Sequence, residues 1–152
     1  MAKAGDNSKK ALVAALNGAL ADTLALYVKT KNFHWHVSGA RFRDLHLLFD
    51  EQAVQLLATV DLIGERVRKN AAPTLTSIGA IAKATRIKDQ DKELPAEKMV
   101  RELRDDNATL LKRLREVKEA AEQAGDSATS GAVDGWIDLA EERVWFLSET
   151  MK

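Results

Sequence analysis

Apolar side chains recur every three or four residues along four long stretches of this 152-residue chain, as on the buried face of a helix. The pattern predicts helices over about residues 9–36, 41–68, 95–124 and 127–151, with residues at their ends that start or stop helices. Asn7 or Ser8 suits the first N-cap, Gly39 and Gly125 suit helix ends, and Pro95 suits a first helical turn. Residues 1–8 are small and polar and are expected to form a flexible N-terminal tail.

Residues 70–94, between the second and third long helices, form a connection longer than a bundle hairpin needs. A short helix is expected within 74–84, around Ile78 and Ile81, followed by a charged loop over 86–93. The prediction is therefore an all-α fold, a four-helix bundle with a short crossover helix between the second and third long helices. Residues 9–152 are expected to form a single domain, and periodicity alone leaves other four-helix topologies open.

Charge and composition narrow the classes of function. The 23 basic and 23 acidic residues cancel, so DNA binding would need a local basic cluster rather than a global attraction. Without cysteine there is no disulfide framework, thiolate metal site or cysteine nucleophile. The N-terminus lacks the apolar run of a secretory signal, and no stretch approaches ~20 continuous apolar residues, so we expect a cytoplasmic protein with no membrane partner.

The second predicted helix carries side chains that folding alone does not explain. Asp50, Asp61 and Glu65 lie about 40°, 60° and 100° around the helix from His46, away from the stripe that faces the core. Carboxylates on an apolar surface are costly unless they are paired or bound to a cation. This side is also apolar, and so should contact a partner outside its own bundle, because it carries Leu47, Val54, Leu57 and Ala58.

Two pairs on this helix, His46/Asp50 and Asp61/Glu65, have the i, i+4 spacing that lets two side chains bind one ion. Asp50 and Asp61, however, are eleven residues apart, or ~16 Å, which no single metal centre spans. A two-fold axis crossing the helix near residues 55–56 would place His46/Asp50 of one chain opposite Asp61/Glu65 of a second. Two identical sites per dimer would follow from that symmetry.

His34 can join the same site, because it lies five residues before Gly39 and His46 lies seven after it. Two imidazoles and three carboxylates suit Fe(II), Mn(II) or Zn(II) better than Cu(I). His36 lies on the opposite side of its helix from His34 and is not expected to be a ligand. The competing interpretation is a solvated acidic helix face with a capping histidine, and spacing alone leaves both open.

The motif NFHWHVSGARFRDLHLLFDE, followed by VDLIGERV, resembles the Dps family of mini-ferritins (DNA-binding protein from starved cells). TLTSIGAIAKAT in the crossover and ERVWFLSE near the end extend the resemblance over about residues 12–151. It implies a ferritin-like four-helix fold and a hollow dodecamer built from two-fold dimers. It also implies that the crossover helix lies at the two-fold contact.

Carried over by position, the resemblance implies that His34, His46 and Asp50 of one chain and Asp61 and Glu65 of its partner form a di-iron ferroxidase centre. Proteins of this family oxidise Fe(II), preferably with hydrogen peroxide, and store the ferric mineral inside. The implied enzyme is thus a ferroxidase whose metal is iron. A classical ferritin site inside one bundle would need Glu-x-x-His pairs, and no histidine follows His46, so that site is excluded.

Other residues match the family less completely. Trp35 corresponds to a tryptophan beside the site that can quench a stray oxidising equivalent, although ordinary interface packing explains it equally well. Trp136 and Trp145 are expected to pack within the bundle. The candidates for the acidic pores that admit iron in relatives, where the third helix meets the fourth, are Glu122, Asp126 and Asp134.

DNA binding in the family often uses a mobile, lysine-rich N-terminal tail. This chain offers only Lys3, Lys9 and Lys10 there, although a multimer could strengthen weak contacts. The alternative function is therefore a DNA-condensing, DNA-protecting protein, associated with the nucleoid, in which iron oxidation is secondary.

Overall fold

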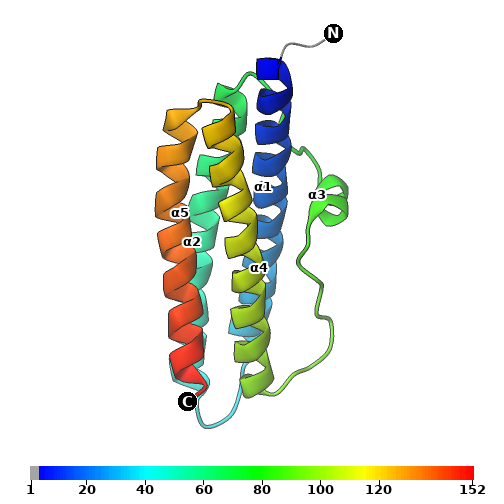
Figure 1. Ribbon diagram of the computed structural model, residues 1–152. Coiled ribbons are helices and arrows are strands. Elements are labelled where there is room, and N and C mark those ends of the chain that lie inside the picture. Colours follow the sequence, from blue (N-terminus) through cyan, green and yellow to red (C-terminus); the bar gives the residue numbers. More distant parts are fainter. Residues whose placement is uncertain (1–3) are drawn as a thin grey trace.

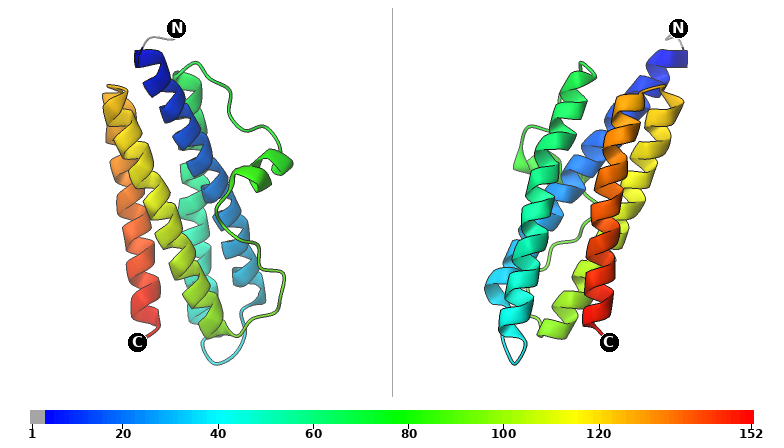
Figure 2. Two further views of the ribbon diagram at one scale, coloured as in Figure 1. Left: turned by 45° about the vertical axis from the view of Figure 1, so that its right-hand side comes forward. Right: turned by 90° about the vertical axis from the view of Figure 1, so that its left-hand side faces the viewer.

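The computed structural model describes residues 4–152, and within them it contains five helices and no strand. Four long helices run side by side and the short α3 lies beside α1 (Figure 1): α1 (Ala4–His36), α2 (Phe42–Lys69), α3 (Ile78–Ala84), α4 (Ala96–Gln123) and α5 (Ser127–Thr150). α1 and α2 form one antiparallel hairpin, α4 and α5 a second, and α1 packs against α4. The connection through α3 runs along the outside of the bundle from one end to the other (Figure 2). The predicted all-α bundle with a short crossover helix is confirmed.

The first helix begins earlier than predicted. Residues 4–8 belong to α1, which corrects the expected flexible tail over residues 1–8; residues 1–3 of that tail lie outside the described residues. Asp6 lies in the first turn, where a carboxylate interacts favourably with the helix dipole. Asn7 and Ser8 are consequently inside the helix rather than at its N-cap.

Two glycines with positive φ make the turns of the two hairpins. Gly39 has φ 102° after α1, and Gly125 has φ 70° after α4, a conformation that side chains with a Cβ rarely adopt. The Gly125 turn leads directly to Asp126, whose side chain accepts a hydrogen bond from the Thr129 backbone N–H and so caps α5.

The core lies between the four long helices and follows the predicted stripes closely. Phe33, Phe49, Leu56 and Ile63 are fully buried or nearly so. The apolar repeat of the third long helix predicts six core positions, and all six are buried in α4: Val100, Leu103, Leu110, Leu114, Val117 and Ala121. The sequence also predicts that Trp136 and Trp145 pack within the bundle. Trp136 is there, but the prediction for Trp145 is wrong, because Arg143 and Leu147 take the core face of α5 and turn Trp145 outward, 60% exposed.

A buried cation links the two hairpins at mid-height. Arg143 of α5 donates from Nε to Asn107 Oδ1 of α4 at 2.7 Å and from Nη1 to Gln55 Oε1 of α2 at 3.2 Å. Burial lowers the pKa of Arg143 to about 10, so the guanidinium stays charged at neutral pH. Gln55 also donates to Glu142 at 3.1 Å, and these polar contacts fix α2 against α5.

The crossover is anchored to the bundle by a fully buried carboxylate, Asp22 of α1. It accepts hydrogen bonds from Thr85 Oγ1 at 2.8 Å, from the Arg86 backbone N–H at 2.6 Å and from Arg113 Nε at 2.9 Å. Arg113 also donates to the Ala84 carbonyl at 3.2 Å, and a Cβ at Gly18 would overlap its guanidinium. The last residues of α3 are thereby held against α1 and α4.

By length and composition, α1 could cross a membrane, which differs from the expectation that no segment is apolar enough. Half of its most apolar window is buried inside the bundle. The core helix of a soluble bundle passes the same test, so the packing against α2 and α4 accounts for its composition.

Replacing Arg113 by Met should destabilise the fold by ~3 kcal/mol, because it leaves a buried carboxylate without its cation. Urea unfolding should show this loss, and hydrogen exchange should show faster exchange over residues 78–87. The matched control is Arg86→Gln, which removes an exposed ion pair with Glu116 and should cost less than ~1 kcal/mol. Equal losses in the two variants would contradict the anchoring role of Asp22.

Candidate metal centre

The turn between α1 and α2 brings two histidines from different helices into contact. His34 lies in the last turn of α1 and His46 in the second turn of α2. Their rings stack with 3.9 Å between centroids and 15° between planes, and Phe42 stacks on the other side of His46 at 5.0 Å. The predicted meeting of these two histidines across the Gly39 turn is confirmed.

Reciprocal hydrogen bonds fix the protonation of both rings. His34 Nδ1 lies 2.6 Å from the His46 carbonyl oxygen, and His46 Nδ1 lies 2.8 Å from the His34 carbonyl oxygen. Because a carbonyl oxygen can only accept, each Nδ1 carries the proton and donates it. In the neutral rings each Nε2 therefore keeps a free lone pair, which is the arrangement that metal-binding histidines use.

Asp50 lies beside this pair, one turn along α2 from His46. Its Oδ1 is 3.8 Å from His34 Nε2, too long for a hydrogen bond but within the ~4.2 Å that one ion at ~2.1 Å from each atom can bridge. The structure thus brings His34 and His46 into contact and places Asp50 beside His34.

Lys31 is a residue of this cluster that the sequence analysis missed. Its Nζ donates to Asp50 Oδ1 at 2.9 Å and lies 5.8 Å from the ring centroid of Trp35. The hydrogen bond from Lys31 and the positive charge of that lysine lower the pKa of Asp50. The only signal in the sequence was a lysine one turn before His34, on the same side of α1.

The other two predicted ligands do not join this cluster within one chain. Asp61 and Glu65 are exposed and lie ~16 Å or more along α2 from Asp50, and Glu65 is 3.9 Å from Lys69. Among residues 4–152, no three His, Asp or Glu side chains converge tightly enough to hold a metal ion. A single chain therefore presents at most parts of a centre.

The side of α2 that carries these carboxylates is exposed and apolar. We call it the α2 outer face, and it comprises Leu47, Asp50, Val54, Leu57, Asp61, Leu62 and Glu65. No other helix of the described chain covers the outward side of α2 (Figure 2). The aliphatic side chains Leu47, Val54, Leu57 and Leu62 are between 46% and 63% exposed. An apolar surface of this kind on a soluble chain marks an interaction site.

Three pairs of residues on or beside this face are symmetric about one point of the helix. The pairs His46/Glu65, Asp50/Asp61 and Val54/Leu57 all have their midpoint between Gln55 and Leu56. Antiparallel packing of two copies about that point would set each member of a pair opposite the other, with aliphatic side chains at the axis and metal ligands on either side.

Comparison with known proteins identifies the family. The model of the ferritin-like domain matches residues 13–152. A DNA protection during starvation protein of Brevibacillus brevis is 32% identical over 132 residues, 87% of this chain and 89% of that protein. The chain belongs to the Dps family. A low temperature-induced protein of Nostoc is 33% identical over 144 residues, 93% of this chain and 80% of that protein.

Solved Dps structures share the whole fold. Dps from Thermosynechococcus elongatus superposes with a TM-score of 0.95 at 25% identity, covering 99% of this chain and 96% of that one. Dps from Vibrio cholerae, described as a ferritin-like diiron-carboxylate protein, gives 0.91 at 29% identity, covering 96% and 92%. The ferritin-like fold is confirmed, and membership of the Dps family supports iron binding and a general role in iron storage or DNA protection.

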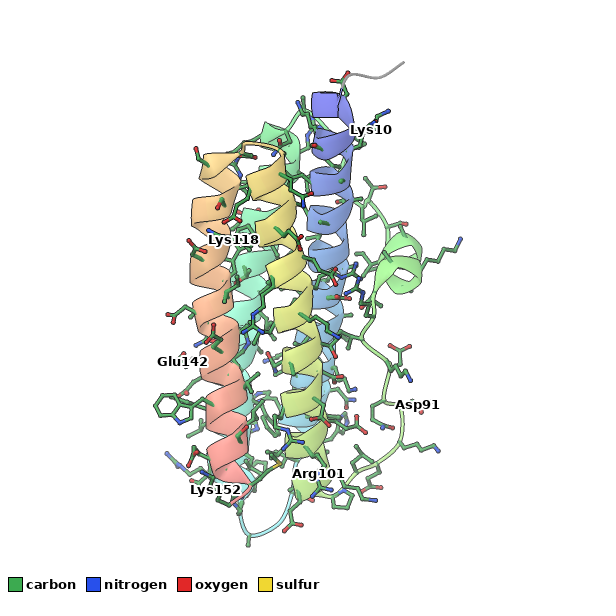
Figure 3. The ribbon with its side chains drawn as sticks, viewed as in Figure 1. Lys10, Asp91, Arg101, Lys118, Glu142 and Lys152 are labelled. Carbon is green, nitrogen blue, oxygen red and sulfur yellow. The ribbon has the colours of Figure 1, made fainter. Side chains whose placement is uncertain are left out.

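Glu122, Asp126 and Asp134 are the candidates for an acidic iron pore. Of these, Asp126 is hydrogen-bonded to other residues of its own chain. Asp126 bonds Thr129, Asn70 and Arg66 and is only 17% exposed. Glu122 and Asp134 are exposed, but both lie within 4 Å of Lys118 at the end where α4 meets α5 (Figure 3). Asp126 thus caps α5 within the single chain.

His36 is directed away from the histidine pair. Its Nδ1 lies 2.8 Å from both the backbone oxygen and the side-chain oxygen of Asn32, which holds the ring near the crossover. His36 thus takes no part in the His34–His46 contact.

Asp126→Ala should destabilise this Dps chain by ~1–2 kcal/mol at neutral pH, because it removes a helix cap and a charge-assisted contact. Burial alone would raise the pKa of Asp126, but the hydrogen bonds from Thr129 and Asn70 and the charge of Arg66 lower it from 3.8 to about 2. The ionised group therefore contributes stability above about pH 4, and that stability is lost as the pH falls through about 2.

Urea unfolding of the wild type and of Asp126→Ala, at the same protein concentration, gives their free energies of unfolding. The difference between the two free energies should shrink between pH 4 and pH 2. A difference that stays constant over that range would mean that the charge of Asp126 contributes nothing to the contact.

Proposed function

We propose that this protein is an iron-detoxifying and iron-storing ferroxidase that oxidises Fe(II) at di-iron centres shared between two copies of the chain. The observation that carries the proposal is the His34–His46 pair, in which both Nδ1 atoms face carbonyl oxygens and His34 Nε2 lies 3.8 Å from Asp50 Oδ1. Asp61 and Glu65 lie at the positions on α2 that a two-fold axis would bring to the same place.

The residues have distinct tasks in this proposal. His34 and His46, held by each other's carbonyl oxygens, present two nitrogen ligands without needing to rearrange. Asp50 would bridge towards the partner, whose Asp61 and Glu65 complete the oxygen ligands. Lys31 neutralises Asp50 until iron displaces it. The set of nitrogen and carboxylate donors fits Fe(II), and its carboxylates favour the Fe(III) product.

Two irons in one centre suit hydrogen peroxide as the oxidant. Two Fe(II) ions together give the two electrons that, with two protons, reduce one peroxide to two waters. Neither iron then needs to give a single electron, the step that would release a hydroxyl radical. In the absence of a second iron, Trp35 next to the centre can supply an electron, and 63% of its surface is exposed in the single chain.

The proposed assembly is a hollow dodecamer of two-fold dimers in the cytoplasm, with the ferric mineral inside. Each dimer would carry two centres, because the axis relates them. The apolar α2 outer face supports the two-fold contact, and the crossover fixed by Asp22 presents Ile78, 78% exposed, on the same molecule.

Replacing His46 by Gln and Asp50 by Asn together should slow peroxide-dependent Fe(II) oxidation by about 100-fold or more. Loss of a residue that only hydrogen-bonds a metal ligand already lowers activity by ~10–100-fold, and here two ligands themselves are lost. The rate is measured by stopped-flow absorbance, and size-exclusion chromatography should show an unchanged assembly. The matched control, His36→Gln with Asp44→Asn, removes the same groups elsewhere in these helices and should keep the wild-type rate. Unchanged kinetics in the first variant would defeat the assignment of the centre.

DNA protection is the second candidate function. The Brevibacillus relative is named for it, and Lys9 and Lys10 are exposed at the N-terminal end of α1, where Figure 3 labels Lys10. Two lysines per chain give a weak contact, but twelve copies on one particle would multiply it.

If this candidate is right, a gel shift of duplex DNA should appear at ~50 mM salt and disappear by ~200 mM. It should also disappear in Lys9→Gln/Lys10→Gln and persist in the control Lys83→Gln/Lys88→Gln. No shift of the wild-type protein at the lower salt concentration would exclude DNA condensation.

A further inference from the structure

Three carboxylates of the α2 outer face would gather at each proposed centre where two copies meet. Each proposed centre gathers Asp50 from one chain and Asp61 and Glu65 from the other. The lysines available are Lys31, which is 2.9 Å from Asp50, and Lys69, which is 3.9 Å from Glu65 in an exposed i, i+4 pair. Of the three carboxylates, Asp61 alone has no cation within 4 Å among the described residues.

The unpaired charge falls on Asp61. Among the described residues Asp61 forms no ion pair within 4 Å. In the single chain water solvates its carboxylate, because Asp61 is exposed. On packing of two outer faces, Val54 and Leu57 would cover the axis and withdraw water from the carboxylates that flank it. Removing a carboxylate from water without a counter-charge opposes association.

A divalent cation removes this penalty, because it supplies two positive charges to ligands from both chains. We propose that a divalent cation at this centre is the effector of two-fold assembly: metal binding tightens the dimer, and dimer formation raises the affinity for metal. The proposal rests on the shared centre described above, and it adds that assembly responds to metal. The two effects must be equal in free energy, because binding linkage is reciprocal.

Zn²⁺ serves as the test ion, because it is not oxidised and accepts the same nitrogen and oxygen ligands. Association of the full chain is measured by sedimentation velocity over a range of protein concentrations. The buffer holds the highest urea concentration that leaves the helices intact by circular dichroism, with either EDTA or Zn²⁺. With Zn²⁺ at 100 times its dissociation constant, the dimer dissociation constant should fall by about 100-fold for each centre.

Asp61→Asn with Glu65→Gln gives the distinguishing result. In EDTA this variant should associate at least about 10-fold more tightly than the wild type, because its centre no longer gathers like charges. Zn²⁺ should then change its association by less than about 3-fold, which is below the effect of a single occupied centre. Lys31→Met should act in the opposite direction, weakening association in EDTA and increasing the response to Zn²⁺. The control Asp138→Asn/Glu141→Gln removes two exposed charges of α5 and should follow the wild type.

Two contrary results have different meanings. If the wild-type protein binds Zn²⁺ in equilibrium dialysis but its association does not change, metal-linked assembly is overturned and the proposed centre stands. If it binds no Zn²⁺ at all, the proposed centre itself fails. A weaker association of Asp61→Asn/Glu65→Gln in EDTA would also overturn the proposal, because it would show that these carboxylates favour the contact without metal.

Discussion

The side chains of α2 are divided between two apolar faces, and a single four-helix bundle can bury only one of them. Leu45, Phe49, Leu56 and Ile63 pack inward, while the α2 outer face remains exposed. The crossover does not cover this second face. Asp22 and Arg113 hold it against α1 and α4, so no segment of the described chain covers the outer side of α2 (Figure 2). The single chain therefore has a fully packed core but an apolar surface left exposed on α2.

The candidate centre depends on the backbone as much as on its ligands. The Gly39 turn sets α1 against α2 so that each histidine meets the carbonyl oxygen of the other, and two hydrogen bonds then fix two tautomers. Because both acceptors are backbone carbonyl oxygens, a substitution at one histidine removes the ring stacking but leaves the other ring its hydrogen bond. Lys31 occupies the remaining side, so the carboxylate of Asp50 has a cation beside it before any metal arrives.

Periodicity and spacing predicted the parts of this structure that depend on neighbours along one helix. The four long helices, the core stripe of α4 and the outer face of α2 follow from intervals of three and four residues. The errors concern choices between elements. Trp145 lies outside the core because Arg143, whose partners Asn107 and Gln55 come from other helices, takes the core face of α5. The contacts of Asp126 with Arg66 and Asn70 could not be predicted, because those residues are distant in sequence. Lys31 was missed because a lysine one turn from a histidine carries no distinct signal.

Dividing a metal centre between two chains has a consequence for its chemistry. In the proposed arrangement, a half-centre of two histidines and one lysine-paired carboxylate would have too few ligands to hold two irons, so an unassembled chain would be a poor catalyst. The apolar contact that buries Val54 and Leu57 would also exclude water from the space in which the ligands meet, and electrostatic interactions strengthen there. In the proposed dimer, the contact that covers the second face of α2 would thus create both the ligand set and the low-dielectric surroundings of the centre.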